Sequence, residues 1–304
     1  MGSLNVRKRE YLRTKKLPHI WCPGCGNGII TAALIRAIEE LPFEHRDVVV
    51  VSGIGCSSRA TGYLNFNTLH TTHGRALAYA TGLKLARPEL KIFVIMGDGD
   101  CAAIGGNHFI HAARRNIDLK AIIVNNYIYG MTGGQHSPLT PKGKKATTAP
   151  GGTLERPFDL LELARAAGAT FGARGTAANP RQLERLISSQ AEHKGFSVLE
   201  ALSICPTSMG RKNKEGSAVD MLRSLKERSV SLEEEGDNRL PGALPDVSSD
   251  LEGKILTGVL YVRQEPEFTE EYYRMISRCS KQQAGWEINQ YSAGNSNKGC
   301  LKGE

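Results

Sequence analysis

The segment spanning residues 97–132 constrains the fold more than any other part of the chain. An apolar run, residues 91–96, ends at the sequence Gly-Asp-Gly, and a second apolar run, residues 121–124, ends at Asn-Asn. The intervening segment has a helical pattern, so the stretch predicts a parallel β-α-β unit. Open α/β sheets bind ligands at the carboxyl ends of their strands. Both polar sequences therefore mark a candidate site.

The side chains at these two strand ends suit a divalent cation. Asp98 offers a carboxylate and Asn126 an amide oxygen, and Mg²⁺ prefers such oxygen ligands together with phosphate oxygens and water. Glycines 97 and 99 let the backbone come close to a ligand. Gly-Asp-Gly alone is also an ordinary turn sequence. That explanation weakens here because Asn125 and Asn126 close the same unit.

The seven cysteines indicate metal ligation rather than disulfides. Their odd number, the chain length of 304 residues and the absence of an apolar leader argue against a disulfide framework. Cys22 and Cys25 form a Cys-x-x-Cys pair, while Cys56 and Cys205 each follow a predicted strand. Their thiols are therefore expected at the same sheet edge as Asp98.

Four thiols at one edge suit either zinc or an iron–sulfur cluster. Zinc sites usually draw on two local pairs, whereas here one pair joins two distant single cysteines. This pattern favours a cluster and leaves zinc open. Cys101, Cys279 and Cys300 belong to no such pattern and are assigned no role.

Several phrases together resemble the β subunit of a 2-oxoacid:ferredoxin oxidoreductase, most closely the two-subunit 2-oxoglutarate:ferredoxin type. They run in order over roughly two-thirds of the chain, which makes chance agreement implausible. The phrases are WCPGCGNG (21–28), IGCSSR (54–59), HGRA (73–76), GDGD (97–100), NNYIYGMTGGQHSP (125–138) and CPT (205–207).

The resemblance implies an α/β thiamine-diphosphate-binding fold with a mostly parallel sheet flanked by helices. Residues 1–209 are expected to form this domain and to bind thiamine diphosphate and a [4Fe–4S] cluster. Residues 210–304 change in character, with a charged helix-prone segment, a Pro/Gly/Asp/Ser-rich stretch, a strand-like run over residues 254–262, a helical segment over residues 267–279 and a polar tail. They are expected to form a C-terminal extension that packs on a partner subunit, and partial disorder is the alternative.

By the same resemblance, Cys22, Cys25, Cys56 and Cys205 hold the cluster. Asp98, the Asn126 side chain and the Ile128 carbonyl hold Mg²⁺, which grips the cofactor's diphosphate. The expected thiamine-diphosphate contacts are Ile54, Gly55, Cys56, Ser57, His73, Gly97, Asp98, Gly99, Asp100, Asn126, Ile128, Gly130, Met131 and Thr132.

His73 and Arg59 are the candidate catalytic residues. By resemblance, His73 faces the cofactor, although it is also an ordinary polar residue near the start of a predicted helix, residues 71–86. Arg59 follows Cys56 by three positions, and its fork of donors could pair with the distal carboxylate of 2-oxoglutarate. A salt bridge at a subunit interface is the alternative for Arg59.

The activity that the resemblance implies is oxidative decarboxylation of 2-oxoglutarate to succinyl-CoA and CO₂. Coenzyme A is the co-substrate, electrons pass through the cluster to ferredoxin, and the reverse reaction is a reductive carboxylation. A β subunit specific for pyruvate or for many 2-oxoacids is the alternative. A non-oxidative thiamine-diphosphate enzyme would not need the cysteines, and a zinc-stabilised binding module would not need the Gly-Asp-Gly and Asn-Asn sequences.

The family places the carboxylate that activates the cofactor on another polypeptide, so an α subunit and a dimer of heterodimers are expected.

The formal charge of +8 fits a solvated basic surface better than nucleic-acid binding, because no nucleic-acid motif accompanies it. A face for an acidic partner such as ferredoxin is a third explanation. No apolar run approaches the length of a membrane span, and a cytoplasmic protein is expected.

Overall fold

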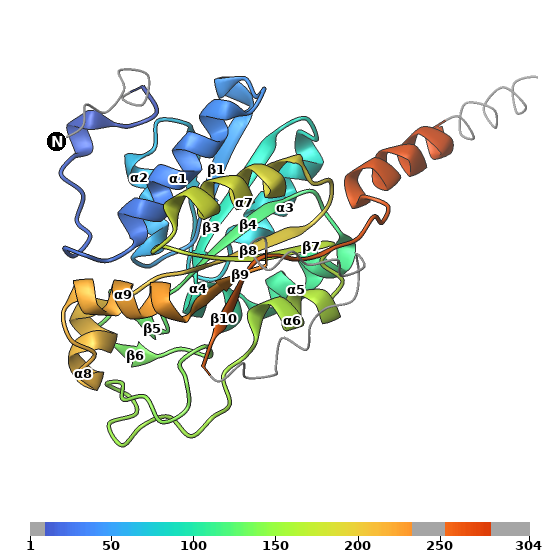
Figure 1. Ribbon diagram of the computed structural model, residues 1–304. Coiled ribbons are helices and arrows are strands. Elements are labelled where there is room, and N and C mark those ends of the chain that lie inside the picture. The colour runs from blue at the N-terminus through green and yellow to red at the C-terminus, as the bar shows by residue number, and fades with distance from the viewer. Residues whose placement is uncertain (1–9, 233–252, 281–304) are drawn as a thin grey trace, which may run out of the picture.

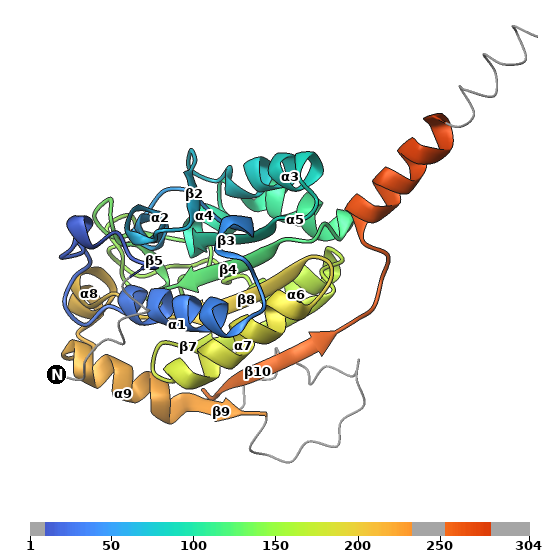
Figure 2. The same ribbon diagram turned by 90° about the horizontal axis from the view of Figure 1, so that it is seen from above.

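The computed structural model describes residues 10–232 and 253–280, and its centre is an eight-stranded sheet (Figures 1 and 2). All neighbours from β2 to β7 are parallel, whereas β10 runs antiparallel to β7 and parallel to β9. In spatial order the strands are β2 (Asn67–His70), β1 (Val48–Ser52), β3 (Lys91–Gly97), β4 (Lys120–Asn125), β8 (Ser197–Leu202), β7 (Phe171–Thr176), β10 (Ile255–Val262) and β9 (Ser229–Ser231). The predicted mostly parallel α/β sheet is confirmed.

Helices cover both faces of the sheet, because its central strands are apolar on both sides. In β1, Val48 and Val50 belong to one core cluster while Val49 and Val51 belong to the other. The first face is covered by α1 (Asn27–Glu40), α2 (Ala60–Tyr63) and α7 (Pro180–Glu192). The second is covered by α3 (Ala76–Ala86), α5 (Gly106–Arg115) and α6 (Leu160–Ala166).

The segment between Gly-Asp-Gly and Asn-Asn forms two helices rather than one. Helix α4 (Asp98–Ala102) begins immediately after β3, and α5 follows a short break. A Cβ at Gly105 would lie 2.3 Å from the carbonyl oxygen of Asp100, so the chain changes direction where only glycine fits. The predicted β-α-β unit is therefore confirmed with its helix divided, and Asp98 occupies the first turn of α4.

Helix α3 begins later than the predicted helix over residues 71–86. Gly74 has a φ of +72°, and its N–H donates to Asp100 Oδ1 at 2.6 Å. This contact holds residues 71–75 in a turn at the carboxyl edge of the sheet, which places His73 beside α4.

The C-terminal region contains the predicted strand, now β10, and the predicted helix, but its strand joins the central sheet. Met221 and Leu225 of α9 (Ala218–Arg228) are buried, and β10 contributes Leu260 and Tyr261 to the core. The α/β domain therefore does not end at residue 209, because later strands complete its sheet. Residues 268–280 form a helix that projects from the body (Figures 1 and 2). The predicted Pro/Gly-rich stretch, the polar tail and Cys300 lie outside the described residues.

The remaining short elements connect these layers or build the loop after β4. They are η2 (Thr14–Lys16), η3 (His45–Asp47), η4 (Ser57–Arg59), β5 (Ile128–Tyr129), β6 (Gln135–His136), η5 (Pro206–Gly210) and α8 (Arg211–Asn213). In the described part of the chain, every helix is too short or too polar to traverse a bilayer.

Gly172 on β7 is expected to be intolerant of any side chain. It pairs with Tyr261 of β10, and a Cβ there would lie 2.2 Å from the tyrosine ring. Gly172→Ala should therefore reduce the free energy of unfolding by about 1–3 kcal/mol, the usual cost of overpacking. Gly82→Ala in α3 is the control, because nothing lies within 4 Å of its Cβ position, and it should gain up to about 1 kcal/mol. Equal urea midpoints for Gly172→Ala and the unmodified protein would contradict this.

Candidate active site

A cavity of about 190 Å³ lies at the carboxyl edge of β1, β3 and β4. The structure gathers around it every residue that the sequence predicts to contact thiamine diphosphate. Val124 and Tyr129, which were not predicted, also line it. The lining residues are Ile54, Gly55, Cys56, Ser57, His73, Gly97, Asp98, Gly99, Asp100, Val124, Asn126, Ile128, Tyr129, Gly130, Met131 and Thr132.

Asp98 is a buried carboxylate at this cavity. The hydroxyl of Ser137 donates to its Oδ2, yet no lysine or arginine among the described residues pairs with it. Burial raises the pKa of Asp98 to about 7. A buried carboxylate without a cationic partner is costly, and a bound divalent ion would remove that cost. Asp98 therefore fits the role of a cation ligand.

Asn126 and Ile128 face the same cavity from the turn that follows β4. The side-chain oxygen of Asn126 accepts the N–H of Ile128 at 3.3 Å, which keeps the turn compact. Together with Asp98 they offer a carboxylate, an amide oxygen and a backbone carbonyl, the oxygen donors that suit Mg²⁺.

Asp100 orients His73 beside the cavity. Its Oδ1 lies 2.7 Å from Nδ1 of His73 and accepts the N–H of Gly74. Asp100 fits only because residue 53 is glycine, where a Cβ would lie 2.1 Å from Oδ2. Asp100 contacts Nδ1 of His73 and makes no contact with Nε2, the other ring nitrogen. A protonatable group is thus held at the rim of the site.

The four predicted cluster cysteines approach one another beside this cavity. Sγ of Cys22 and Sγ of Cys205 lie 3.7 and 3.8 Å from the Thr207 hydroxyl. A Cβ at Gly130 would lie 3.3 Å from Sγ of Cys205 and 3.6 Å from Sγ of Cys56. Gly130 also lines the 190 Å³ cavity, so the thiols and the cavity share a wall.

The environment of these thiols is electrostatically unfavourable for several thiolates. Burial, followed by the charges of Cys205, Cys25 and Cys22, raises the pKa of Cys56 to about 11. Burial likewise raises the pKa of Cys25. Within residues 10–232 and 253–280, no three His, Cys, Asp or Glu side chains are grouped closely enough to bind one shared metal ion. This does not conflict with a [4Fe–4S] cluster, in which each cysteine binds a different iron.

Arg59 is separated from the other predicted residues. It ends η4 and does not line the cavity as the structure describes it. Its Nε is buried and has no hydrogen-bond partner in the described part of the chain. The structure therefore places the predicted cofactor residues, including His73, around one cavity, whereas Arg59 is not among the residues that line it.

Tyr129 was missed because its aromatic side chain carries no ligand-binding pattern in the sequence. Its hydroxyl donates to the carbonyl of Gly99 at 3.1 Å, and a Cβ at Gly99 would lie 2.1 Å from its ring. The close approach explains why glycine follows Asp98. Tyr129 thereby joins the turn after β4 to the start of α4.

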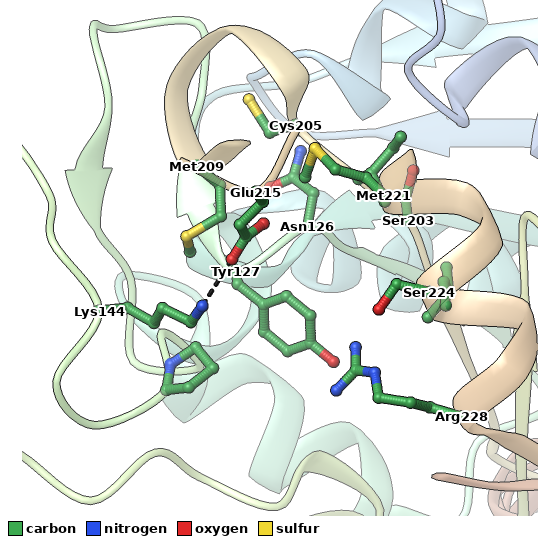
Figure 3. A pocket seen from close by; sticks show the side chains of 13 residues that line it. Asn126, Tyr127, Lys144, Ser203, Cys205, Met209, Glu215, Met221, Ser224 and Arg228 are labelled. Atoms are coloured by element: carbon green, nitrogen blue, oxygen red, sulfur yellow. Dashed lines mark hydrogen bonds and ion pairs between the residues drawn. The ribbon is translucent and has the colours of Figure 1, made fainter. Parts of the chain in front are cut away.

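A second cavity, of about 430 Å³, shares Asn126 with the first (Figure 3). The ring of Tyr127 points into it, and the guanidinium of Arg228 lies near the tyrosine hydroxyl (Figure 3). Lys144 and Glu215 form an ion pair of 2.6 Å at its wall. Tyr127 therefore faces away from the cofactor cavity, although its neighbours Asn126 and Ile128 line it.

Comparison with known proteins identifies the family. Residues 26–201 match the family described as thiamine pyrophosphate enzyme, C-terminal TPP binding domain. The 2-oxoglutarate synthase subunit KorB of Methanocaldococcus jannaschii is 51% identical over 273 residues, which cover 90% of this chain and 98% of that protein. KorB of Archaeoglobus fulgidus is 57% identical over 230 residues, which cover 74% of this chain and 84% of that protein.

A solved structure agrees with these sequence relatives. It is the 2-oxoglutarate:ferredoxin oxidoreductase from Magnetococcus marinus with 2-oxoglutarate, coenzyme A and succinyl-CoA bound. The match has a TM-score of 0.82 at 34% identity and covers 91% of this chain and 92% of that chain. The predicted thiamine-diphosphate-binding fold is thereby confirmed. The chain belongs to the KorB family of 2-oxoglutarate synthase subunits, within the β subunits of the 2-oxoacid:ferredoxin oxidoreductases.

Proposed function

We propose that this chain is the β subunit of a 2-oxoglutarate:ferredoxin oxidoreductase. In this proposal it converts 2-oxoglutarate and coenzyme A to succinyl-CoA and CO₂, passes electrons to ferredoxin, and also supports the reverse carboxylation. The observation that carries the proposal is the shared wall at Gly130, which borders both the cavity and two of the four thiols. A non-oxidative enzyme of this fold would not need the four cysteines.

Each residue has a separate task in this scheme. Asp98, Asn126 and the carbonyl of Ile128 hold Mg²⁺, which suits the oxygen donors found there. Cys22, Cys25, Cys56 and Cys205 hold a [4Fe–4S] cluster. When bound, thiamine diphosphate supplies the nucleophile and electron sink for decarboxylation, and the cluster accepts electrons singly.

The rest of the chain positions and shields these groups. His73, oriented by Asp100, holds a proton-accepting nitrogen at the rim. The apolar side chains of Val124, Ile128 and Tyr129 form a wall that excludes water from the reacting centre.

An α subunit completes the enzyme in this proposal, and we expect a dimer of heterodimers. The relative from Aeropyrum pernix is named a β subunit. The helix over residues 268–280 carries exposed apolar side chains at Tyr272, Met275 and Ile276. An extended apolar face of this kind is typical of a surface that packs on a partner. Cys101 and Cys279, which the proposed cluster does not use, are not in disulfides, which fits a reducing compartment such as the cytoplasm.

The proposal is tested on the two-subunit complex purified without oxygen. We expect about four irons and four sulfides per β chain, as a [4Fe–4S] site requires. Addition of 2-oxoglutarate should produce an EPR signal from a radical or reduced cluster, and coenzyme A should change it. Zinc in place of iron, or no signal with any 2-oxoacid, would disprove the electron-transfer role. A stronger response to pyruvate would favour the pyruvate-specific alternative.

Arg59 provides a test of substrate choice. If its guanidinium pairs with the distal carboxylate, Arg59→Gln should raise the KM for 2-oxoglutarate by about 10- to 100-fold, since a charge-assisted hydrogen bond contributes about 1.5–3 kcal/mol. The KM for pyruvate, which lacks that carboxylate, should change less than about threefold by the same reasoning. Steady-state kinetics with both substrates measure this difference. An equal change in both KM values would assign Arg59 to the protein framework instead.

A further inference from the structure

Three polar side chains lie side by side in neighbouring strands behind the Asn125–Asn126 turn. They are Arg174 on β7, Glu200 on β8 and Asn125 at the end of β4, and Arg174 pairs with Glu200 in the strand register. Only 3% of Glu200 and 2% of Asn125 is exposed. Charged residues are almost never this deeply buried unless they are paired, so this group requires an explanation.

The carboxylate of Glu200 is fully engaged by its two neighbours. Arg174 Nε lies 2.7 Å from Oε2, and the side-chain N–H of Asn125 donates to Oε1 at 2.8 Å. Arg174 also reaches Asp159, whose carboxylate accepts the first N–H groups of α6. Burial alone would lower the pKa of Arg174, but the charges of Glu200 and Asp159 raise it. The arginine is therefore a permanent cation that fixes Glu200.

Asn125 transmits this arrangement to the turn. Its side-chain oxygen accepts the N–H of Tyr127 at 3.0 Å, while Thr140 donates to the carbonyl of Tyr127 at 2.5 Å. Tyr127 has a φ of +63°, a conformation that is strained for a bulky residue. Such strain persists only where the surroundings impose it. The Asn125 amide and the Thr140 hydroxyl hold its backbone, and its ring packs against the core.

Tyr127 stands between Asn126 and Ile128, the two proposed Mg²⁺ ligands that follow β4. A different φ at Tyr127 would turn its ring out of the second cavity (Figure 3) and change the direction of both neighbours. The conformation of this one residue therefore decides whether the Asn126 side chain and the Ile128 carbonyl face the same point.

We propose that Glu200 is a positioning residue of the magnesium site. Fixed by Arg174, it holds the Asn125 amide, and that amide keeps Tyr127 in the conformation that presents both ligands. The inference rests on the proposed function for the identity of the ion. It also explains why an ion pair is kept in the sheet, since a buried pair stabilises a fold little better than apolar side chains do.

Two double variants separate positioning from packing. Arg174→Met with Glu200→Gln and Arg174→Met with Glu200→Leu both remove the buried ion pair, and the partly exposed Asp159 loses its contact with Arg174 equally in both. Glutamine retains an oxygen for the Asn125 amide, whereas leucine does not. Leucine leaves the buried N–H of the Asn125 side chain without an acceptor, which costs about 1–3 kcal/mol, so the two variants are compared under conditions in which both remain folded.

The first measurement is hydrogen exchange in the metal-free two-subunit complex, followed by mass spectrometry on the peptide that contains Tyr127. Exchange of the Tyr127 N–H should accelerate at least tenfold with leucine and less than threefold with glutamine. This result depends on no metal. Equal exchange in both variants and the unmodified protein would overturn the inference.

The second measurement is calorimetric titration of Mg²⁺ into the complex in the presence of thiamine diphosphate. Loss of a group that orients a metal ligand typically costs about 10–100-fold in affinity, and we expect this loss with leucine but not with glutamine. If both variants lose Mg²⁺ affinity equally, the effect comes from the loss of the ion pair and not from the contact between Glu200 and the Asn125 amide. This result would overturn the inference. Unmodified complex that fails to bind Mg²⁺ would disprove the proposed function, while the exchange result would still test the turn.

If neither double variant folds, Asn125→Ala tests the contact between Asn125 and Tyr127 directly. It leaves the Arg174–Glu200 contact in place and removes the amide, which contacts both Tyr127 and Oε1 of Glu200. The same acceleration of exchange is expected, and unchanged exchange would contradict the inference.

Discussion

Asp98→Asn is expected to weaken the binding of Mg²⁺ with thiamine diphosphate by more than about 100-fold. Loss of a residue that only orients a metal ligand typically costs about 10–100-fold in affinity, and loss of the ligand itself should cost more. The substitution keeps the shape of the side chain and its contact with Ser137 but removes the charge that a cation requires. Calorimetric titration of the two-subunit complex measures the change. Affinity within tenfold of the unmodified complex would exclude Asp98 as a ligand.

The same substitution should stabilise the metal-free protein at high pH. Burial raises the pKa of Asp98 to about 7 from an ordinary value near 3.8, so the folded state retains a proton that the unfolded state has lost. The contribution of Asp98 to stability therefore falls as pH rises from about 4 to 7 and levels off above. Asp98→Asn should abolish that decline in urea unfolding of the metal-free complex.

Asp118 is the matched control for Asp98. Burial would raise its pKa, but Lys120 and Lys84 lower it to about 2, and Lys84 Nζ lies 2.8 Å from Oδ2. Asp118→Asn leaves two buried lysines short of a partner and should cost about 3–5 kcal/mol in unfolding free energy. Mg²⁺ affinity should not change, because Asp118 does not line the cavity. Asp118→Asn should thus lower stability without changing Mg²⁺ affinity, whereas Asp98→Asn should lower Mg²⁺ affinity.

Cys205→Ser is expected to reduce the iron content from about four atoms per chain to fewer than one, because a [4Fe–4S] cluster is ordinarily held by four thiolates. The Cys205 sulfur lies beside Gly130 and the Thr207 hydroxyl, among the other three cysteines. Iron and sulfide analysis of the anaerobic complex measures the loss. Undiminished iron would remove Cys205 from the ligand set.

Cys101→Ser is the control for cysteine replacement. Cys101 is fully buried in the apolar core and takes no part in the group of four. Serine there should lower stability by about 1–3 kcal/mol, because a hydroxyl is buried in an apolar environment, and should leave the iron content unchanged. Loss of iron in both variants would indicate general unfolding rather than loss of a ligand.

The residues that the resemblance assigns to thiamine diphosphate line one cavity because they follow strand ends. Polar residues at the carboxyl ends of parallel strands meet at one edge, whatever the distance between them along the chain. Asp98, Asn126 and Gly55 could be placed together on that argument. Arg59 could not, because it ends the short helix η4 rather than a strand, and the direction of its side chain leaves no pattern in the sequence.

The sheet beyond β7 was not predicted because its pairing is not local. The run that becomes β10 has a strand pattern, but nothing within it indicates that it pairs with Phe171–Thr176. The Arg174–Glu200–Asn125 group was missed for a similar reason. Arg174 and Glu200 each interrupt an apolar strand, and the rule that buried charges are paired could have linked them.

The group of four cysteines also constrains the order of events during synthesis. Cys22 and Thr207, which share a contact, are 185 residues apart. At about 5–20 residues per second, the ribosome needs roughly 10 to 40 s to make that length. Cys22 and Cys25 therefore emerge long before Cys205, and the sheet that brings them together cannot close until β8 pairs with β4. For that interval the nascent chain carries unpartnered thiols, and any metal centre that requires all four must be inserted after translation has passed residue 205.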